Sequence, residues 1–258
     1  MAGVHGDEPC RVEALREILK LIDDKKIIIH RGTVHIIFAH LPAIARDLRH
    51  IEMNLNRAFR PDNLLSNLEL ASYERKRALE LMPYLQKNNA LLDIHSSSSK
   101  KSIPFIICEP HSFDLAGQLP FPIISHGWDE IEKGGTDYYV NRQGGKGLCI
   151  EGGYHYDPQA SGRALNAAKI FLSLLLSTAP SYPAKQQWQR IIHANFIYVT
   201  KINFKLTQNF ADFQPIKAGQ LIGYDGDKEV RAQEDGVIIF AHNRTGPKKE
   251  AFILGLEQ

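Results

Sequence analysis

The sequence predicts an α/β fold in which a mainly parallel mixed sheet carries helices on both faces and is followed by a small C-terminal all-β domain. Short continuous apolar runs alternate with helix-like segments, which is typical of a parallel sheet covered on both faces. After residue 180 the pattern changes to closely spaced β-like runs separated by turn residues. We therefore expect a larger domain at 1–180 and a smaller one at 188–258, joined by a polar, proline-containing linker at 177–187.

The helix-like segments combine an apolar stripe of helical period with good helix formers. The first begins directly after Pro9, which suits the first turn of a helix, and Ser161 is a candidate N-cap for the last. These segments are 10–24, 68–88 and 161–177.

The strand-like runs are short, apolar and bounded by polar or turn residues. In the first part of the chain they fall at 26–30, 33–40, 90–95, 103–109, 121–125 and 147–151. In the C-terminal part they fall at 194–202, 220–225, 236–242 and 251–256.

The composition excludes several functional classes. A net charge of +2 over 258 residues gives no reason to expect a nucleic-acid partner or a membrane surface. The longest apolar stretch, at 170–177, is too short to cross a bilayer. Three widely spaced cysteines do not suggest a disulfide framework, and no secretory signal opens the sequence, so we expect a cytoplasmic protein. An exposed sheet edge would favour pairing of chains, which leaves a homo-oligomer open.

Residues with metal-binding chemistry stand at the predicted ends of strands, where open parallel sheets bind their ligands. His5 and Glu8 lie three residues apart on a glycine-containing turn, and His95 ends the run at 90–95. Together they form a two-histidine, one-carboxylate set, which is a hydrolytic zinc arrangement with one position left for water. Each residue taken alone has a simpler interpretation, because an isolated histidine more often satisfies a local hydrogen bond.

Two further stretches fit the same site. Glu151 follows an apolar strand, so partial burial is expected to raise its pKa toward neutrality, as a general base requires; a capping or salt-bridge role is the alternative. The segment 49–60 offers Arg49, Asn56 and Arg57, whose guanidinium and amide groups suit the capture of a carboxylate. A solvated charged face is the alternative there.

Four motifs together resemble the succinylglutamate desuccinylase/aspartoacylase family, relatives of the zinc carboxypeptidases. They are GVHGDEP, NLNRAF, DIHSS and CIEGG, in family order, within residues 3–165. The resemblance implies one Zn²⁺ per chain held by His5, Glu8 and His95, with Glu151 as general base and acid. It implies hydrolysis of the amide bond of a small N-acyl amino acid, and a C-terminal β domain that narrows the active-site entrance.

The resemblance also assigns substrate contacts. Asn56 and Arg57 match the family's carboxylate-binding pair, and Arg49 matches an arginine that polarises the scissile carbonyl. Tyr138 and Arg142 match a substrate-binding tyrosine and arginine by spacing alone.

The sequence departs from the family pattern in two places. Gly246-Pro247 stands where aspartoacylases carry a tyrosine in front of a KKEAF-like segment, so N-acetylaspartate specificity is not implied. No strand-like run precedes His5, although family members have one, and we expect residues 1–4 to be the end of a strand, with weakened metal affinity. Two other functions stay open: a zinc carboxypeptidase acting on short peptides, and a degenerate, non-catalytic metal-binding member.

Overall fold

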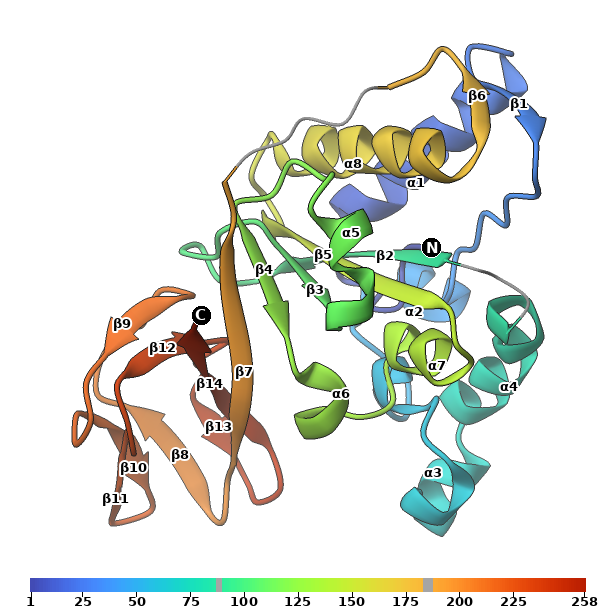
Figure 1. Ribbon diagram of the computed structural model, residues 1–258. Coiled ribbons are helices and arrows are strands. Elements are labelled where there is room, and N and C mark those ends of the chain that lie inside the picture. Colours follow the sequence, from blue (N-terminus) through green and yellow to red (C-terminus); the bar gives the residue numbers. More distant parts are fainter. Residues whose placement is uncertain (87–89, 183–187) are drawn as a thin grey trace.

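The computed structural model describes residues 1–86, 90–182 and 188–258, with the backbone alone at residues 9 and 10. Its main feature is a mixed eight-stranded sheet in the order β2-β5-β3-β4-β7-β14-β12-β9 (Figure 1). In that order the strands are Ala90–Ser97, Lys146–Tyr154, Phe105–Cys108, Ile123–His126, Arg190–Val199, Glu250–Glu257, Gly236–Ile239 and Gln214–Ile216.

The parallel and antiparallel pairs of this sheet are unevenly distributed. β2 pairs with β5, β3 with β4 and β4 with β7 in parallel, whereas β3 and β5 are antiparallel. Beyond β7 all the pairs are antiparallel. The predicted fold class is therefore confirmed, with the parallel pairs in the part of the sheet that carries the helices.

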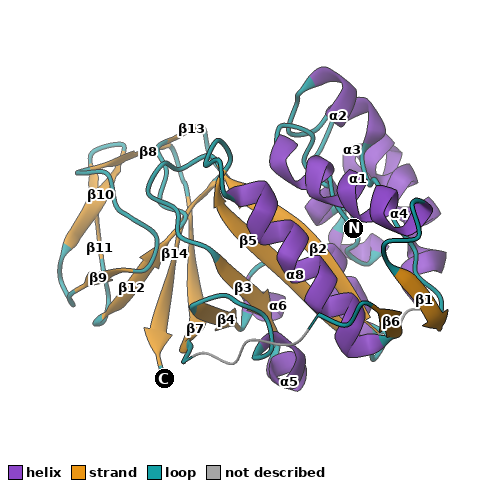
Figure 2. Cartoon of the chain, turned by 90° about the horizontal axis from the view of Figure 1, so that it is seen from above, coloured by secondary structure: helices purple, strands orange, loops and turns teal. Residues whose placement is uncertain are grey.

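Helices cover both faces of the sheet. α1 and α8 lie against each other on one face, with α8 over β5 and β2, while α7 packs on the opposite face of the same two strands and contacts α4 (Figures 1 and 2). The helices are α1 Pro9–Asp23, α2 Leu41–Arg46, α3 Asn67–Ala71, α4 Tyr73–Gln86, α5 Phe113–Ala116, α6 Trp128–Ile131, α7 Thr136–Arg142 and α8 Ala160–Leu175. Short 3₁₀ turns span Leu55–Arg57, Asp62–Leu64 and Pro110–Ser112.

The first residues lie beside β2, the edge strand of the main sheet. Ala2 bridges in parallel to both Ile94 of β2 and Phe38. The backbone nitrogen of Ala2 donates to the Ile37 carbonyl at 3.0 Å, and Ile94 donates to the Met1 carbonyl at 3.1 Å. Of residues 1–4 only Ala2 makes strand-like bridges, and these fix the start of the loop that carries His5. The weakened metal affinity expected from a shortened strand stays a prediction.

The C-terminal strands continue the main sheet instead of standing apart from it. β7 pairs in parallel with β4, and β14, β12 and β9 follow. A separate four-stranded sheet, β11-β10-β8-β13, completes this part. Its strands are Lys228–Arg231, Leu221–Asp225, Asn203–Leu206 and Arg244–Thr245. The division at 180–188 stays a prediction, since the hydrogen bonds of the sheet cross it.

Some local predictions are wrong. The run at 33–40 is not a strand, because only Phe38 within it makes a bridge. β1, Ile28–Arg31, pairs away from the main sheet with β6, Ser177–Ala179, inside the predicted linker. Residues 183–187 of that linker lie outside the described residues.

Two helix details also differ. The helix predicted at 68–88 is broken at Ser72, whose extended backbone ends α3 and whose hydroxyl accepts the Arg75 amide proton at 3.1 Å. Serine favours such a cap over a helix interior because its side chain competes for backbone hydrogen bonds. The last two residues of the predicted helix, 87–88, lie outside the described residues. Ser161 is inside α8, whose N-cap is Gln159 without a side-chain bond. No helix of the described residues is long and apolar enough to cross a membrane.

Gly6 lies where the loop after the first strand end touches the backbone of α2. A Cβ atom at this position would overlap the Ala43 carbonyl group and the Ile44 nitrogen. Backbone atoms cannot move aside as the end of a flexible side chain can. The glycine therefore permits a close backbone contact with α2, and this contact sets the position of the turn that carries His5 and Glu8.

We expect Gly6→Ala to lower the free energy of unfolding by about 1–3 kcal/mol through overpacking. Gly162→Ala is the matched control, because a Cβ there has nothing within 4 Å and the residue is exposed in α8. The control is expected to gain about 0.5–1 kcal/mol. Urea unfolding of both variants measures the difference, and equal stabilities would contradict this account of Gly6.

Candidate metal and catalytic site

Strand alternation divides β2 and β5 into an apolar face and a polar face. Leu92 and Ile94 of β2 belong to the cluster under α1 and α8, as do Leu148 and Ile150 of β5. Because successive side chains of a strand point to opposite faces, the residues between them face the other way. On β2 these are Asp93 and His95, and on β5 they are Cys149 and Glu151. In the parallel register His95 is opposite Glu151 and Asp93 is opposite Cys149.

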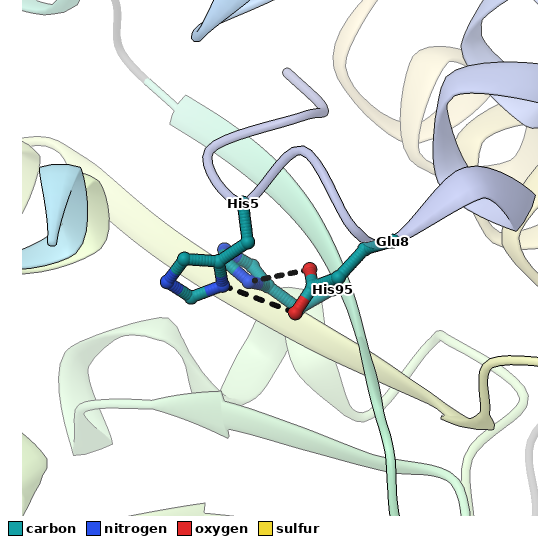
Figure 3. Close-up of side chains that lie close together, drawn as sticks. All are labelled: His5, Glu8 and His95. Atoms are coloured by element: carbon teal, nitrogen blue, oxygen red, sulfur yellow. Dashed lines mark hydrogen bonds and ion pairs between the residues drawn. The ribbon is translucent and has the colours of Figure 1, made fainter. Parts of the chain in front are cut away.

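The loop that enters α1 brings the other two predicted ligands to this polar face (Figure 3). His5 Nδ1 lies 3.0 Å from Glu8 Oε1, and His95 Nδ1 lies 3.4 Å from Glu8 Oε2. One ligand atom from each of the three residues can be chosen so that all three atoms lie within 4.8 Å of one another, and all three side chains are buried. The structure thus assembles the predicted set from segments 87 residues apart in the sequence.

The second ring nitrogen of each histidine faces a side-chain oxygen. His5 Nε2 donates to Asn54 Oδ1 at 2.9 Å, whereas His95 Nε2 lies 3.1 Å from Asp93 Oδ2 in an ion-pair contact without hydrogen-bond geometry. Thr136 donates to the same Asp93 oxygen at 2.5 Å. Metal-binding histidines usually donate their other N–H to such an oxygen, as His5 does, which fixes the tautomer and the ring orientation. The two Nδ1 atoms and the Glu8 carboxylate are therefore a donor set that fits Zn²⁺.

The charges around His5 and Glu8 favour the forms that bind metal. Burial, assisted by the nearby Arg49 charge, lowers the pKa of His5 to about 3, so its imidazole is neutral. Burial opposes ionisation of Glu8, yet Arg11 and His5 hold the pKa of Glu8 well below its usual range. Arg11 is fully buried, with Nη2 2.5 Å from Glu8 Oε2. A charged carboxylate and a neutral imidazole are the states that coordinate a cation. At His95 burial disfavours the charged ring, but Asp93 and Glu8 raise its pKa to about 10, so a metal ion would have to displace a proton from this histidine.

Glu151 has the surroundings of a general base. It is 8% exposed, and Oε2 has no hydrogen-bond partner among the described residues. Burial raises the pKa of Glu151 to about 7; the His95 charge opposes this shift and Glu8 adds to it. A carboxyl group with a pKa near neutrality can both accept and release a proton at physiological pH.

Cys149 provides an alternative ligand group with His95 and Glu151, whose donor atoms meet the same 4.8 Å spacing. Burial raises the pKa of the Cys149 thiol well above its usual range. Because a thiol must lose its proton to bind a metal, this group is the weaker candidate.

A pocket of about 280 Å³ opens onto these residues. Arg49, Asn56 and Arg57 line it, together with Ser96 and His155. Ser96 Oγ and His155 Nδ1 are 2.5 Å apart. The C-terminal part of the chain completes the wall with Phe240, His242, Arg244, Glu250, Phe252 and Ile253.

Two predicted substrate residues do not reach this pocket. Tyr138 is 7% exposed within α7 and Arg142 is exposed at the end of the same helix, and neither lines the pocket. From this region Gly135 and Asp137 line it instead. Sequence spacing placed Tyr138 and Arg142 on the correct helix, but which face of the helix meets the pocket depends on how α7 packs on β5.

Arg57 reaches the pocket but is not free. Its Nε and Nη2 donate to the two Glu250 oxygens at 3.1 and 2.9 Å, and Nη2 also bonds Glu132. Its Nη1 donates to the Asn56 carbonyl at 2.8 Å. These carboxylates come from α6 and β14, far from Arg57 in the sequence, so no motif indicated the pairing.

Sequence reasoning missed the residues that orient the ligands. Asn54 opens the NLNRAF motif and Asp93 opens DIHSS, so both were within reach of a motif argument. Arg11 follows Glu8 by three residues on the first turn of α1, a spacing that permits an ion pair. His155 and Glu132 had no such signal.

A second cavity, of about 550 Å³, lies between α1, α8 and residues 32–37. Its lining side chains are apolar apart from Thr33 and His35. The groups suited to acid–base or metal chemistry are therefore concentrated in the smaller pocket.

Buried Glu74 of α4 fixes the loop that supplies Asn54. Its carboxylate accepts hydrogen bonds from the backbone nitrogens of Ile51, Glu52 and Met53 at 2.7–3.3 Å and from His40 Nε2 at 2.9 Å. Burial disfavours the charged form, but these donors outweigh it and lower the pKa of Glu74. Glu74 therefore stabilises the loop while it is ionised.

We expect Glu74→Gln to lower the free energy of unfolding by about 1–3 kcal/mol at pH 7, because several donors lose a charged acceptor. A carboxyl group whose pKa is lowered by folding stabilises above its unfolded pKa, and this stabilisation is lost as the pH falls through the folded value. The deficit of the variant should therefore shrink below about pH 4. Urea unfolding at both pH values tests this, and a deficit independent of pH would contradict it.

Comparison with known proteins shows what this chain is similar to. The sequence profile of the succinylglutamate desuccinylase/aspartoacylase catalytic domain matches residues 1–176. A succinylglutamate desuccinylase from Idiomarina loihiensis is 28% identical over 93% of this chain and 76% of its own length. An N-acyl-aromatic-L-amino acid amidohydrolase from Xenopus tropicalis is 29% identical over 45% of this chain and 38% of its own. The crystal structure of a Vibrio cholerae succinylglutamate desuccinylase superposes with a TM-score of 0.82 at 20% identity, covering 99% of this chain and 79% of that one.

Proposed function

Since the chain belongs to the succinylglutamate desuccinylase/aspartoacylase family, we propose that it is a zinc-dependent amidohydrolase that cleaves the amide bond of a small N-acyl amino acid. The observation that supports this best is the convergence of His5, Glu8 and His95 beside a buried Glu151 in one pocket. His5, Glu8 and His95 would hold the ion through two Nδ1 atoms and a carboxylate. A bound zinc ion supplies a lowered pKa for water and polarisation of a carbonyl oxygen.

The residues of the chain have distinct roles in this proposal. Glu151 accepts a proton as water adds to the amide carbonyl carbon, and returns it to the nitrogen as the C–N bond breaks. The products are a carboxylate and an amino acid. Arg49 lines the pocket with its guanidinium 3.6 Å from Glu8, where it can donate to the developing oxyanion. Asn56 and the residues around Arg57 would bind the rest of the substrate.

We expect purified protein to contain about one zinc per chain and to release free amine from N-acylated amino acids. Glu151→Gln should retain the metal and lose activity by about 10²–10⁴-fold, because only proton transfer is removed. His95→Ala should lose the metal as well. Glu13→Gln, an exposed change on α1, is the control.

Metal analysis and an amine-release assay distinguish the possible failures. Full zinc content with no hydrolysis of any substrate would show a non-catalytic metal-binding protein. Hydrolysis that survives Glu151→Gln unchanged would refute the proposed mechanism.

Phe240, His242 and Arg244 line the pocket, and we expect this wall to leave too little room for a long peptide, which would disfavour the carboxypeptidase alternative. We expect N-acetylated single amino acids to be cleaved at least about tenfold more efficiently than tripeptides. Steady-state kinetics with both kinds of substrate measures this. Faster cleavage of the tripeptides would favour a peptidase.

A further inference from the structure

Arg57 is the cation that would bind the side-chain carboxylate of a dicarboxylate substrate, but carboxylates of the protein already neutralise it inside the pocket. Arg57 uses Nε, Nη1 and Nη2 on Glu250, Glu132 and the Asn56 carbonyl. Its side chain is 16% exposed and that of Glu132 is 18% exposed, so the ion pair is well shielded from water. Removing one partner from a shielded pair leaves the other charge without compensation, so a substrate carboxylate would compete poorly for this arginine.

Carboxylates outnumber guanidinium groups on the pocket wall. Seven aspartate and glutamate side chains line it, against three arginines. Glu132, which bonds Arg57, Asp137, whose charge acts on Arg57, and Asp129, which is close enough to Asp137 for their charges to interact, all line the pocket. Burial and neighbouring carboxylates raise the pKa of Asp129 to about 7 and that of Glu132 to about 8, although Arg57 opposes the shift at Glu132. This part of the wall therefore has a deficit of positive charge.

The opposite charge is available elsewhere in the same pocket. Arg49 and Arg244 both line the pocket, and burial, followed by the Arg49 charge, lowers the pKa of Arg244. Arg244 donates through Nε to the Glu250 carbonyl at 2.6 Å, and Arg49 is loosely placed, with its side chain 50% exposed. These two arginines can receive the α-carboxylate of an amino acid.

Building on the proposed function, we propose that the substrate is an N-acyl basic amino acid, whose ammonium or guanidinium group binds the carboxylates of Asp129, Glu132 and Asp137 while its α-carboxylate binds Arg49 and Arg244. The buried Glu151, whose Oε2 has no partner among the described residues, lines the same pocket and indicates that a ligand completes it. A cation of the substrate would supply the missing positive charge beside Arg57. An acidic amino acid would instead add negative charge to a wall that already has an excess.

In the alternative arrangement, the Glu250 side chain leaves Arg57 and turns to solvent. Its side chain is 45% exposed, so its departure would leave Arg57 with Glu132 alone and partly able to bind a carboxylate. That arrangement predicts a preference for acidic substrates, and the experiment below separates the two.

The zinc-loaded wild-type protein is assayed with Nα-acetyl-lysine, Nα-acetylornithine, N-acetylmethionine, N-acetylaspartate and N-succinylglutamate. We expect kcat/KM for the two basic substrates to exceed that for the two acidic ones at least about tenfold. Equal or better cleavage of the acidic substrates would overturn the inference and leave the amidohydrolase function intact. No Glu151-dependent cleavage of any substrate would instead count against the proposed function.

Binding provides a readout that does not need turnover. Calorimetry with zinc-loaded Glu151→Gln protein should show free lysine binding at least about tenfold more tightly than free aspartate. Aspartate binding as tightly as lysine would overturn the inference even if no substrate were cleaved.

Two variants test the residues themselves. Glu132→Gln should lower the preference for lysine over aspartate at least about fivefold, and the double variant Glu132→Gln/Glu250→Gln, which frees Arg57, should lower it further. Glu130→Gln removes the same charge from the exposed side of α6 and should leave the preference unchanged. A preference that responds equally to Glu130→Gln and Glu132→Gln would refute a specific role for this wall.

Discussion

The parallel pairing of β2 with β5 is the constraint on which the rest of the structure depends. Its register sets His95 opposite Glu151 and Asp93 opposite Cys149, all on one face of the sheet. The other face of the same strands is apolar and buried under α1 and α8. A slip of one residue would expose the apolar side chains and bury the polar ones under the helices. The hydrophobic core therefore fixes the geometry of the site.

The remaining parts of the site are carried by loops that this sheet holds in place. The first residues pair with β2, and the close approach of Gly6 to α2 fixes the turn between His5 and Glu8. Glu74 likewise fixes the loop that carries Asn54, because its carboxylate accepts hydrogen bonds from the backbone of that loop. Loops are where binding and catalytic residues usually lie, and here each functional loop is anchored by a buried contact.

Charge balance gives the pocket its character. On the metal side, Arg11 and His95 compensate the Glu8 carboxylate, while the neutral His5 ring lies 3.0 Å from it. On the Arg57 side, two carboxylates surround one guanidinium and further acidic groups lie nearby. The family relationship supports hydrolysis of an amide bond, whereas the acidic wall formed by Asp129, Glu132 and Asp137 is the part of the pocket that we propose to select the substrate.

The sequence by itself determined the fold class and the four motifs, because strand and helix periods and short-range metal-ligand spacing are local properties. It placed His5, Glu8, His95 and Glu151, since each follows a recognisable local signal at the predicted end of a strand. Only the tertiary structure decided that 33–40 is not a strand, that Tyr138 and Arg142 lie outside the pocket, and that Glu132 and Glu250 neutralise Arg57. These outcomes depend on which distant segments of the chain pack together. The partners of Arg57 are 75 and 193 residues away from it in the sequence, and the orientation of α7 depends on the strands on which it packs, so no local pattern could predict either.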